Sequence, residues 1–148
     1  MENRSLAPFE QLLSGSNERT RTAKSIAEWI AANRGYRWVG IYEVTETEIG
    51  MIACTGSTPP AFPRFPVSRG LCGAAVAAKS TINVGNVQED PRWLTTFGST
   101  HSEIIVPVFT PDSRVVGLID VESDALNAFS RADDTFLTDC AAVIAPLF

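Results

Sequence analysis

Two adjacent apolar segments near the end of the chain constrain its fold most strongly. Residues 102–109 read Ser-Glu-Ile-Ile-Val-Pro-Val-Phe, and residues 114–123 read Arg-Val-Val-Gly-Leu-Ile-Asp-Val-Glu-Ser. Both segments are rich in β-branched residues, and the turn-forming sequence Thr-Pro-Asp-Ser separates them, which is typical of a β-hairpin. The chain is therefore expected to contain an antiparallel sheet that includes these two strands.

The pairing of this hairpin determines where its acidic residues lie. A two- or four-residue turn centred between residues 112 and 113 places Glu103 opposite Glu122, with Asp120 opposite Ile105 on the same face of the sheet. Like charges opposed across strands repel, and partial burial increases the cost. We therefore expect one of three compensations: a cationic group of a ligand, a nearby arginine such as Arg69, or a carboxyl group that keeps its proton.

Two alternatives remain open for these acids. Glu103 and Glu122 stand near strand ends, where charged side chains commonly extend into water. A three-residue loop or a β-bulge would also shift the pairing by one residue and separate the carboxylates. Asp120 is harder to place in solvent, because it follows the apolar run Val-Val-Gly-Leu-Ile within its strand.

The rest of the chain supplies helices at both ends and further strands between them. Hydrophobic periodicity, the four prolines within residues 55–66 and a capping-box sequence at residues 130–133 set the boundaries. The expected elements are a short helix near 9–13, a helix over 15–34 ending at Gly35, strands over 36–44 and 49–54, a short edge strand near 65–67, a small-residue helix over 71–78, a strand over 81–84, a loop over 88–100 with one helical turn, and a final helix from 130. This order predicts a single α+β domain over residues 1–148, with a central antiparallel sheet of about five to six strands.

Composition excludes several classes of protein. The net charge is −5 with no basic stripe, which argues against a nucleic-acid partner. No apolar run is long enough for a membrane span and no signal sequence opens the chain, so we expect a cytoplasmic location. The three cysteines form no Cys-x-x-Cys pair, so we expect no metal site and no cofactor. His101 lacks the partners of a hydrolase triad.

Four segments, in this order, resemble a GAF domain and are most similar to free methionine-(R)-sulfoxide reductases. They are Trp-Val-Gly-Ile-Tyr at 38–42, Pro-Val-Ser-Arg-Gly-Leu-Cys-Gly at 66–73, Ser-Glu-Ile-Ile-Val-Pro at 102–107 and Gly-Leu-Ile-Asp-Val-Glu-Ser at 117–123. The resemblance covers roughly residues 17–148. It implies that the N- and C-terminal helices lie on one face of the sheet and that a ligand pocket lies on the other.

The resemblance also implies which residues line the pocket. The family uses an aromatic pair on the first strand and carboxylates on the last two strands, and the matching residues are Trp38, Tyr42, Glu103, Asp120 and Glu122. The last position is usually Asp in the family. Such carboxylates would hold the ammonium group of an amino acid or the protonated sulfoxide, which agrees with the cationic partner expected from the hairpin.

The redox cysteines depart from the family pattern. The resemblance implies three cysteines, of which only Cys72 is present as a candidate catalytic residue, because Phe62 and Thr96 occupy the other two positions. A reductase cycle needs a second thiol, either Cys54 or an external one. The alternative for Cys72 is a small packing residue, and Cys140 is expected in the core.

Three functions follow as hypotheses. The first is a GAF domain, of a kind used in signalling, that binds a small amine-bearing or polar molecule. The second is a divergent reductase that uses Cys72 and has thioredoxin as its partner. The third is a ligand-free interaction module that forms a homodimer through its terminal helices. The substitutions at Phe62 and Thr96 favour the first hypothesis over the second.

Overall fold

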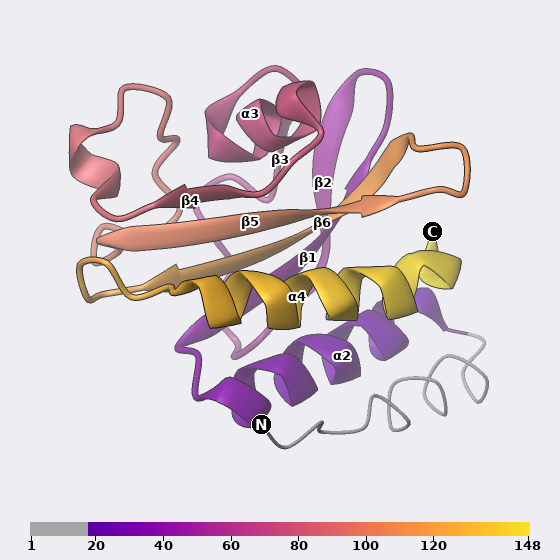
Figure 1. Ribbon diagram of the computed structural model, residues 1–148, viewed down its shortest axis with the longest axis horizontal. Coiled ribbons are helices and arrows are strands. Elements are labelled where there is room, and N and C mark those ends of the chain that lie inside the picture. Colours follow the sequence, from indigo (N-terminus) through magenta and orange to yellow (C-terminus); the bar gives the residue numbers. More distant parts are fainter. Residues whose placement is uncertain (1–17) are drawn as a thin grey trace.

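The computed structural model describes residues 18–148, which form a six-stranded antiparallel sheet with helices on both faces (Figure 1). The spatial order of the strands is β3-β2-β1-β6-β5-β4. Their bounds are β1 Trp38–Val44, β2 Glu48–Cys54, β3 Arg64–Pro66, β4 Ile82–Val84, β5 Ser102–Phe109 and β6 Val115–Ser123. The expected α+β fold with five to six strands is confirmed, and β6, which carries Asp120 and Glu122, lies at its centre.

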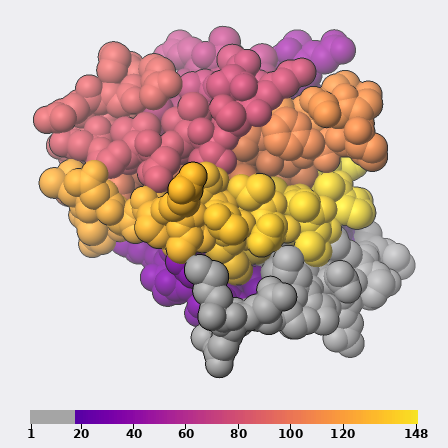
Figure 2. Space-filling model, in the orientation of Figure 1, coloured from indigo at the N-terminus to yellow at the C-terminus, as the bar shows by residue number. Residues whose placement is uncertain are grey.

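The helices divide between the two faces of the sheet. Their bounds are α2 Arg19–Arg34, α3 Gly70–Ala78 and α4 Arg131–Ile144, with single 3₁₀ turns at η1 Val87–Glu89 and η2 Ala145–Leu147. Helices α2 and α4 lie side by side on one face, and α3 lies on the other (Figure 1). In the space-filling view, α4 in yellow borders the rose-coloured surface formed by α3 and the segment after it (Figure 2). Within the described residues, no helix has the length and hydrophobicity needed to cross a membrane.

Local sequence signals explain where these helices begin and end. Helix α2 stops at Gly35, whose φ of 70° lies in the left-handed region that glycine adopts without strain, and its N–H donates to the carbonyl of Ala31. Helix α4 begins at the expected capping box, in which Ser130 and Asp133 each accept from the other's backbone N–H. The helix predicted near 9–13 and the first residues of the helix predicted over 15–34 lie outside the described residues.

Alternation along the strands produces two separate cores. The side chains that face α2 and α4 form one hydrophobic cluster, which includes Val39, Ile41, Ile104, Val106, Ile119 and Val121. The side chains that face α3 belong to a second cluster, which includes Trp38, Tyr42, Ile105 and Leu118. The three acids share this second face, because side chains an even number of residues apart along a strand point the same way. Glu103 is two residues from Ile105, and Asp120 and Glu122 are two and four residues from Leu118.

The turn of the last hairpin differs from the prediction, although the register does not. Thr110 and Arg114 close a three-residue loop in which Ser113 has a φ of 65°. This loop alone would shift the pairing by one residue. Val116 then forms a bulge, since Phe109 pairs with Val115 whereas Val108 pairs with Gly117. The two irregularities cancel, so the acids keep the expected partners.

Candidate functional site

The hairpin brings the three acidic side chains together on the α3 face. Glu103 pairs with Glu122, and Asp120 pairs with Ile105, as the sequence predicted. On its other side Glu122 pairs with Trp38. The carboxyl groups therefore form one cluster at the centre of the sheet, between β1 and β5.

All three acids are buried, and most of their carboxylate oxygens lack a hydrogen-bond donor. Glu103, Asp120 and Glu122 are 3%, 1% and 2% exposed, so the alternative that they extend into water is wrong. Four of their oxygens are buried and accept no hydrogen bond from residues 18–148: Glu103 Oε2, Asp120 Oδ1 and both carboxylate oxygens of Glu122. No ion pair within that part of the chain involves them, and Arg69 is exposed. Arg69 therefore does not neutralise these three acids.

Burial dominates the electrostatics of the cluster. Loss of solvation raises the pKa of Asp120 to about 7 and, with the nearby charge of Asp120, raises the pKa of Glu122 to about 9. Burial and the charges of its two neighbours raise the pKa of Glu103 well above its usual range. In the absence of a bound cation the carboxyl groups are held toward their protonated forms. Of the three compensations expected from the sequence, this one is the carboxyl group that keeps its proton. A cation that enters the cluster would replace those protons.

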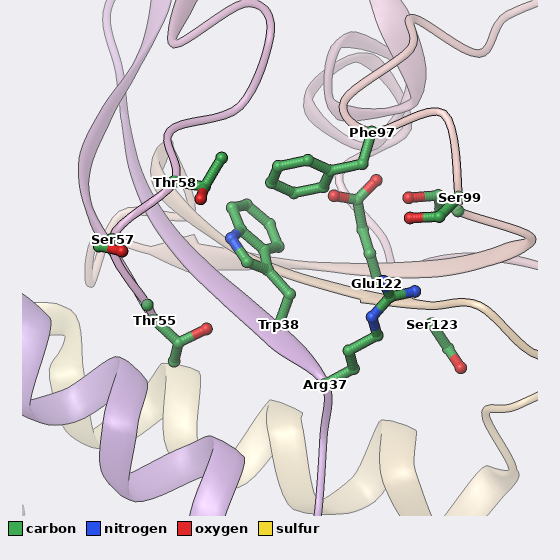
Figure 3. Close-up of a pocket in the computed structure, with 11 residues that line it drawn as sticks. Arg37, Trp38, Thr55, Ser57, Thr58, Phe97, Ser99, Glu122 and Ser123 are labelled. Atoms are coloured by element: carbon green, nitrogen blue, oxygen red, sulfur yellow. The ribbon is translucent and has the colours of Figure 1, made fainter.

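Two hollows of very different size meet this cluster. The larger has a volume of about 380 Å³, and Trp38, Phe97 and Glu122 are among the residues that line it. Figure 3 shows the carboxyl group of Glu122 pointing into the space beside the two aromatic rings. The rings of Trp38 and Phe97 meet edge to face at 5.4 Å between centroids. This pocket combines an apolar wall with one unpartnered carboxyl group.

The smaller hollow has a volume of only about 20 Å³. Glu103 and Asp120 line it, so the structure separates these two acids from Glu122, which lines the larger pocket. Tyr42 also lines it. The three positions at which the family resemblance implies cysteines, Phe62, Cys72 and Thr96, all border this small cavity.

Gly40 brings the aromatic residues of β1 close to the acids. It pairs with Asp120 on β6 and stands between Trp38 and Tyr42 on the same face of β1. A Cβ atom at this position would lie 2.5 Å from the Trp38 ring and 2.8 Å from the Tyr42 ring. The two rings thus close over a backbone position that only glycine leaves free.

Comparison with known proteins places this architecture in a family. A model of the GAF domain matches residues 18–146. The chain belongs to the GAF domain family. The GAF domain-containing protein A of Dictyostelium discoideum is 30% identical over 133 residues, which are 90% of this chain and 83% of that protein.

Free methionine-R-sulfoxide reductases are also among the similar proteins. The enzyme of Saccharomyces cerevisiae is 30% identical over an aligned length of 116, and the match covers 72% of this chain and 60% of that enzyme. The X-ray structure of the enzyme from Neisseria meningitidis, in complex with its substrate, superposes with a TM-score of 0.85 at 28% identity, covering 97% of this chain and 85% of that one. This GAF domain is therefore similar to these reductases in fold and sequence, and it spans less than two thirds of the yeast enzyme.

Cys72 of this GAF domain is a buried thiol rather than an exposed thiolate. It lies in the first turn of α3, and its Sγ is 4.0 Å from Oδ2 of Asp120. Burial and the three neighbouring carboxylates raise its pKa well above the ordinary value. All three cysteines are free; Cys54 is buried in the α3-face core, and Cys140 lies in the other core, as predicted.

Sequence reasoning missed the second wall of the larger pocket. That wall comes from two irregular segments and contains Phe97 together with the hydroxyl-bearing residues Thr55, Ser57, Thr58, Ser99 and Thr100. Irregular segments have no periodicity from which a facing direction can be predicted. One signal was available: Trp93 and Phe97 are large aromatic residues in a polar loop, and such side chains require a surface to bury against.

Proposed function

We propose that this GAF domain binds a small amine-bearing molecule in the larger pocket, with the ammonium group at Glu122. The observation that carries the proposal is that the carboxyl group of Glu122 lines the pocket wall and is buried, and that within residues 18–148 it has no cationic partner and no hydrogen bond of normal geometry. The hydroxyl groups of Thr96 and Thr100 lie near enough to lower its pKa, but burial still raises that pKa to about 9. A buried carboxylate without a partner is costly, and an ammonium group supplies both the opposite charge and the missing donors. Glu103 pairs with Glu122 across the hairpin and Asp120 stands two residues away on β6, so each adds negative potential when an approaching cation displaces its proton.

The other walls of the pocket suit the remainder of such a ligand. The indole of Trp38 and the ring of Phe97 offer apolar contact and, at their faces, cation–π attraction. Arg37 stands at the rim, where it pairs with Asp124 at 3.4 Å between two exposed side chains, and it can exchange that partner for an anionic group of the ligand. A volume of about 380 Å³ lies within the usual range of small-molecule sites, which starts near 300 Å³.

A matched set of ligands and variants tests this proposal. Primary amines and amino acids are compared with neutral analogues of the same shape by calorimetry and thermal shift, on metal-free protein in EDTA. We expect amines to bind and raise the melting temperature, and Glu122→Gln to weaken that binding by at least about tenfold, since charge-assisted hydrogen bonds contribute about 1.5–3 kcal/mol. Glu46→Gln, at an exposed acid away from the pocket, is the control and should bind as the wild type does. Equal binding of neutral analogues, or full binding by Glu122→Gln, contradicts the proposal.

The second candidate function is reduction of free methionine-R-sulfoxide, and the similarity to enzymes of that name favours it. The reaction consumes two thiols: a thiolate attacks the sulfoxide sulfur, the thioether leaves, and a second thiol resolves the resulting sulfenic acid to a disulfide and water. Cys72 is the candidate for the first role and Cys54 or an external thiol for the second. The raised pKa of Cys72 and the side chains Phe62 and Thr96 at the small cavity weigh against this candidate.

A coupled assay separates the two candidates. Free methionine-R-sulfoxide is supplied with thioredoxin, its reductase and NADPH, and NADPH oxidation is followed for the wild type and for Cys72→Ser. We expect no turnover above background from either protein. Turnover by the wild type that disappears in Cys72→Ser would establish the reductase and overturn a role limited to binding.

Homodimer formation through α2 and α4 remains a prediction, as does a cytoplasmic location. The two helices lie together on one face, so a second copy could pair against both at once. Light scattering after size exclusion measures the mass directly. If no compound in the amine panel binds and the mass is that of a dimer, the interaction module becomes the better description.

A further inference from the structure

We infer that the small cavity lined by Glu103 and Asp120 is a site for one transition-metal ion of the zinc type, held by Cys72, Glu103 and Asp120. The inference does not depend on amine binding at Glu122, because the two hollows are lined by different acids. It concerns Glu103 and Asp120, the two acids that the proposed function leaves without a partner.

The geometry is close to that of a coordinated ion. One ligand atom from each of the three residues, the Cys72 sulfur and a carboxylate oxygen of each acid, lies within 4.8 Å of the other two. The Sγ of Cys72 is 4.0 Å from Oδ2 of Asp120. In a tetrahedral zinc site, sulfur and oxygen ligands stand about 3.5 Å apart. A contraction of about half an ångström, within the reach of side-chain rotation, would bring this pair to coordinating separation.

The cavity has the size and the unpartnered atoms that an ion requires. Its volume of about 20 Å³ is close to that of a single water-sized probe, so an organic ligand does not fit. Glu103 Oε2 and Asp120 Oδ1 are buried and receive no hydrogen bond from any residue between 18 and 148. A divalent cation would satisfy both oxygens and remove the repulsion between the two carboxylates, which no cationic side chain in that part of the chain does.

The ligand set selects among metals. A thiolate is a soft ligand that favours zinc and similar transition metals, whereas Mg²⁺ and Ca²⁺ prefer sites made only of oxygen. Three protein ligands leave a fourth position, which faces the remaining lining residues, Tyr42 and Thr96 among them. The indole of Trp93 lies close enough to Glu103 to lower the pKa of its carboxyl group, but its Nε1 is buried and forms no hydrogen bond within residues 18–148. This N–H is therefore free to donate to Glu103 as an outer-shell partner once that carboxylate holds a metal.

The first experiment uses the wild-type protein alone. The protein is stripped with EDTA, dialysed and titrated with Zn²⁺ by calorimetry, and a parallel sample is titrated with Co²⁺ and followed by absorption spectroscopy. We expect one ion per chain and, for Co²⁺, a thiolate-to-metal charge-transfer band with the d–d intensity of a four-coordinate site. Absence of stoichiometric binding, or binding with no thiolate band, overturns the inference.

Substitutions then identify the ligands. Loss of an outer-shell partner usually costs about 10–100-fold in metal affinity, so Cys72→Ser and Asp120→Asn are each expected to lose more than about 100-fold and Trp93→Phe about tenfold. Cys54→Ser removes a buried thiol of the same core but outside the cavity, and it should keep both the affinity and the cobalt spectrum. Circular dichroism establishes that each variant is folded. If a variant fails to fold, the wild-type cobalt spectrum still decides the question. Retention of the thiolate band in Cys72→Ser contradicts the assignment.

The failure of this inference and that of the proposed function can be told apart. The amine measurements are made in EDTA, and the metal measurements contain no amine. Metal binding without amine binding would support the zinc site and contradict the proposed amine site. Amine binding without metal binding would support the amine site and contradict the zinc site.

Discussion

Two buried aspartates in different parts of the same fold have opposite electrostatic environments. Asp133, at the start of α4, is 7% exposed and accepts hydrogen bonds from Arg34, Tyr36 and Ser130. Burial by itself raises the pKa of Asp133, but these donors together hold it below the usual value. Asp120, in the middle of β6, is 1% exposed, has one unpartnered oxygen and has a pKa raised to about 7.

The difference separates a carboxylate that completes the fold from one that is available to a ligand. Asp133 caps α4 and, through Arg34 and Tyr36, ties it to the end of α2, so its charge is satisfied within the protein. Asp120 lies where no residue from 18 onward supplies a cation. Folding therefore gains from the first charge and is opposed by the second, which explains why the acidic cluster rather than the helix junction is the candidate site.

The largest expected effect is at the helix junction. Asp133→Asn keeps the shape of the side chain but removes the charge that Arg34 and Tyr36 contact. Hydrogen bonds to charged groups contribute about 1.5–3 kcal/mol, and Arg34 is one-third exposed, so we expect a loss of about 2 kcal/mol in the free energy of unfolding. Urea denaturation measures it, with the exposed Asp139→Asn on the same helix as the control. A change no larger than that of the control would show that the charge of Asp133 does not stabilise the fold.

The same contribution should disappear in acid. Because the folded-state pKa of Asp133 lies below its usual value of 3.8, the stabilisation is complete above that pH and is lost as the pH falls through the folded-state pKa. The difference of about 2 kcal/mol between wild type and Asp133→Asn is therefore expected to shrink below about pH 4. Urea denaturation at pH 7, 5, 4 and 3 follows the difference directly. A difference that stays constant down to pH 3 would mean that the interaction does not depend on the carboxylate charge.

A smaller effect is expected from filling the space beside Asp120. In Gly40→Ala the new methyl group would meet the rings of Trp38 and Tyr42 at 2.5 and 2.8 Å, and both rings must move. Overpacking of this kind typically costs about 1–3 kcal/mol, and we expect about 1 kcal/mol because one side of Trp38 borders a pocket. The displaced rings should also weaken amine binding. Unchanged stability and unchanged binding would show that the rings do not depend on Gly40.

The smallest effect is expected at Asp120 itself. Asp120→Asn removes one of three crowded carboxyl groups that burial disfavours in their charged form, and it does so without changing the shape of the side chain. Stability should therefore stay within about 1 kcal/mol of wild type or rise slightly. The measurement uses EDTA and urea, since guanidinium is a cation that can enter an acidic pocket. A loss as large as that of Asp133→Asn would remove the contrast between the two residues, because it would show that Asp120 is satisfied inside the protein.

Much of the acidic cluster could be predicted from the sequence, for a local reason. Side chains alternate with a period of two along a strand, so the pairing of Glu103 with Glu122 follows once the hairpin is recognised. The turn itself was predicted wrongly: a three-residue loop and a bulge at Val116 replaced a regular turn. The register remained correct because the two changes compensate, which no local pattern could have indicated.

The sequence by itself determined the sheet, the cap at Ser130, the helix end at Gly35 and the shared face of the three acids, because each depends on neighbours along the strand or helix. Only the tertiary structure decided how those acids are divided, with Glu122 at the large pocket and Glu103 with Asp120 at the small cavity. That division depends on where α3 and the irregular segments around Phe62 and Phe97 pack over the sheet. Contacts between segments distant along the chain leave no periodic trace in the sequence, and they alone determine which buried carboxylate faces which space.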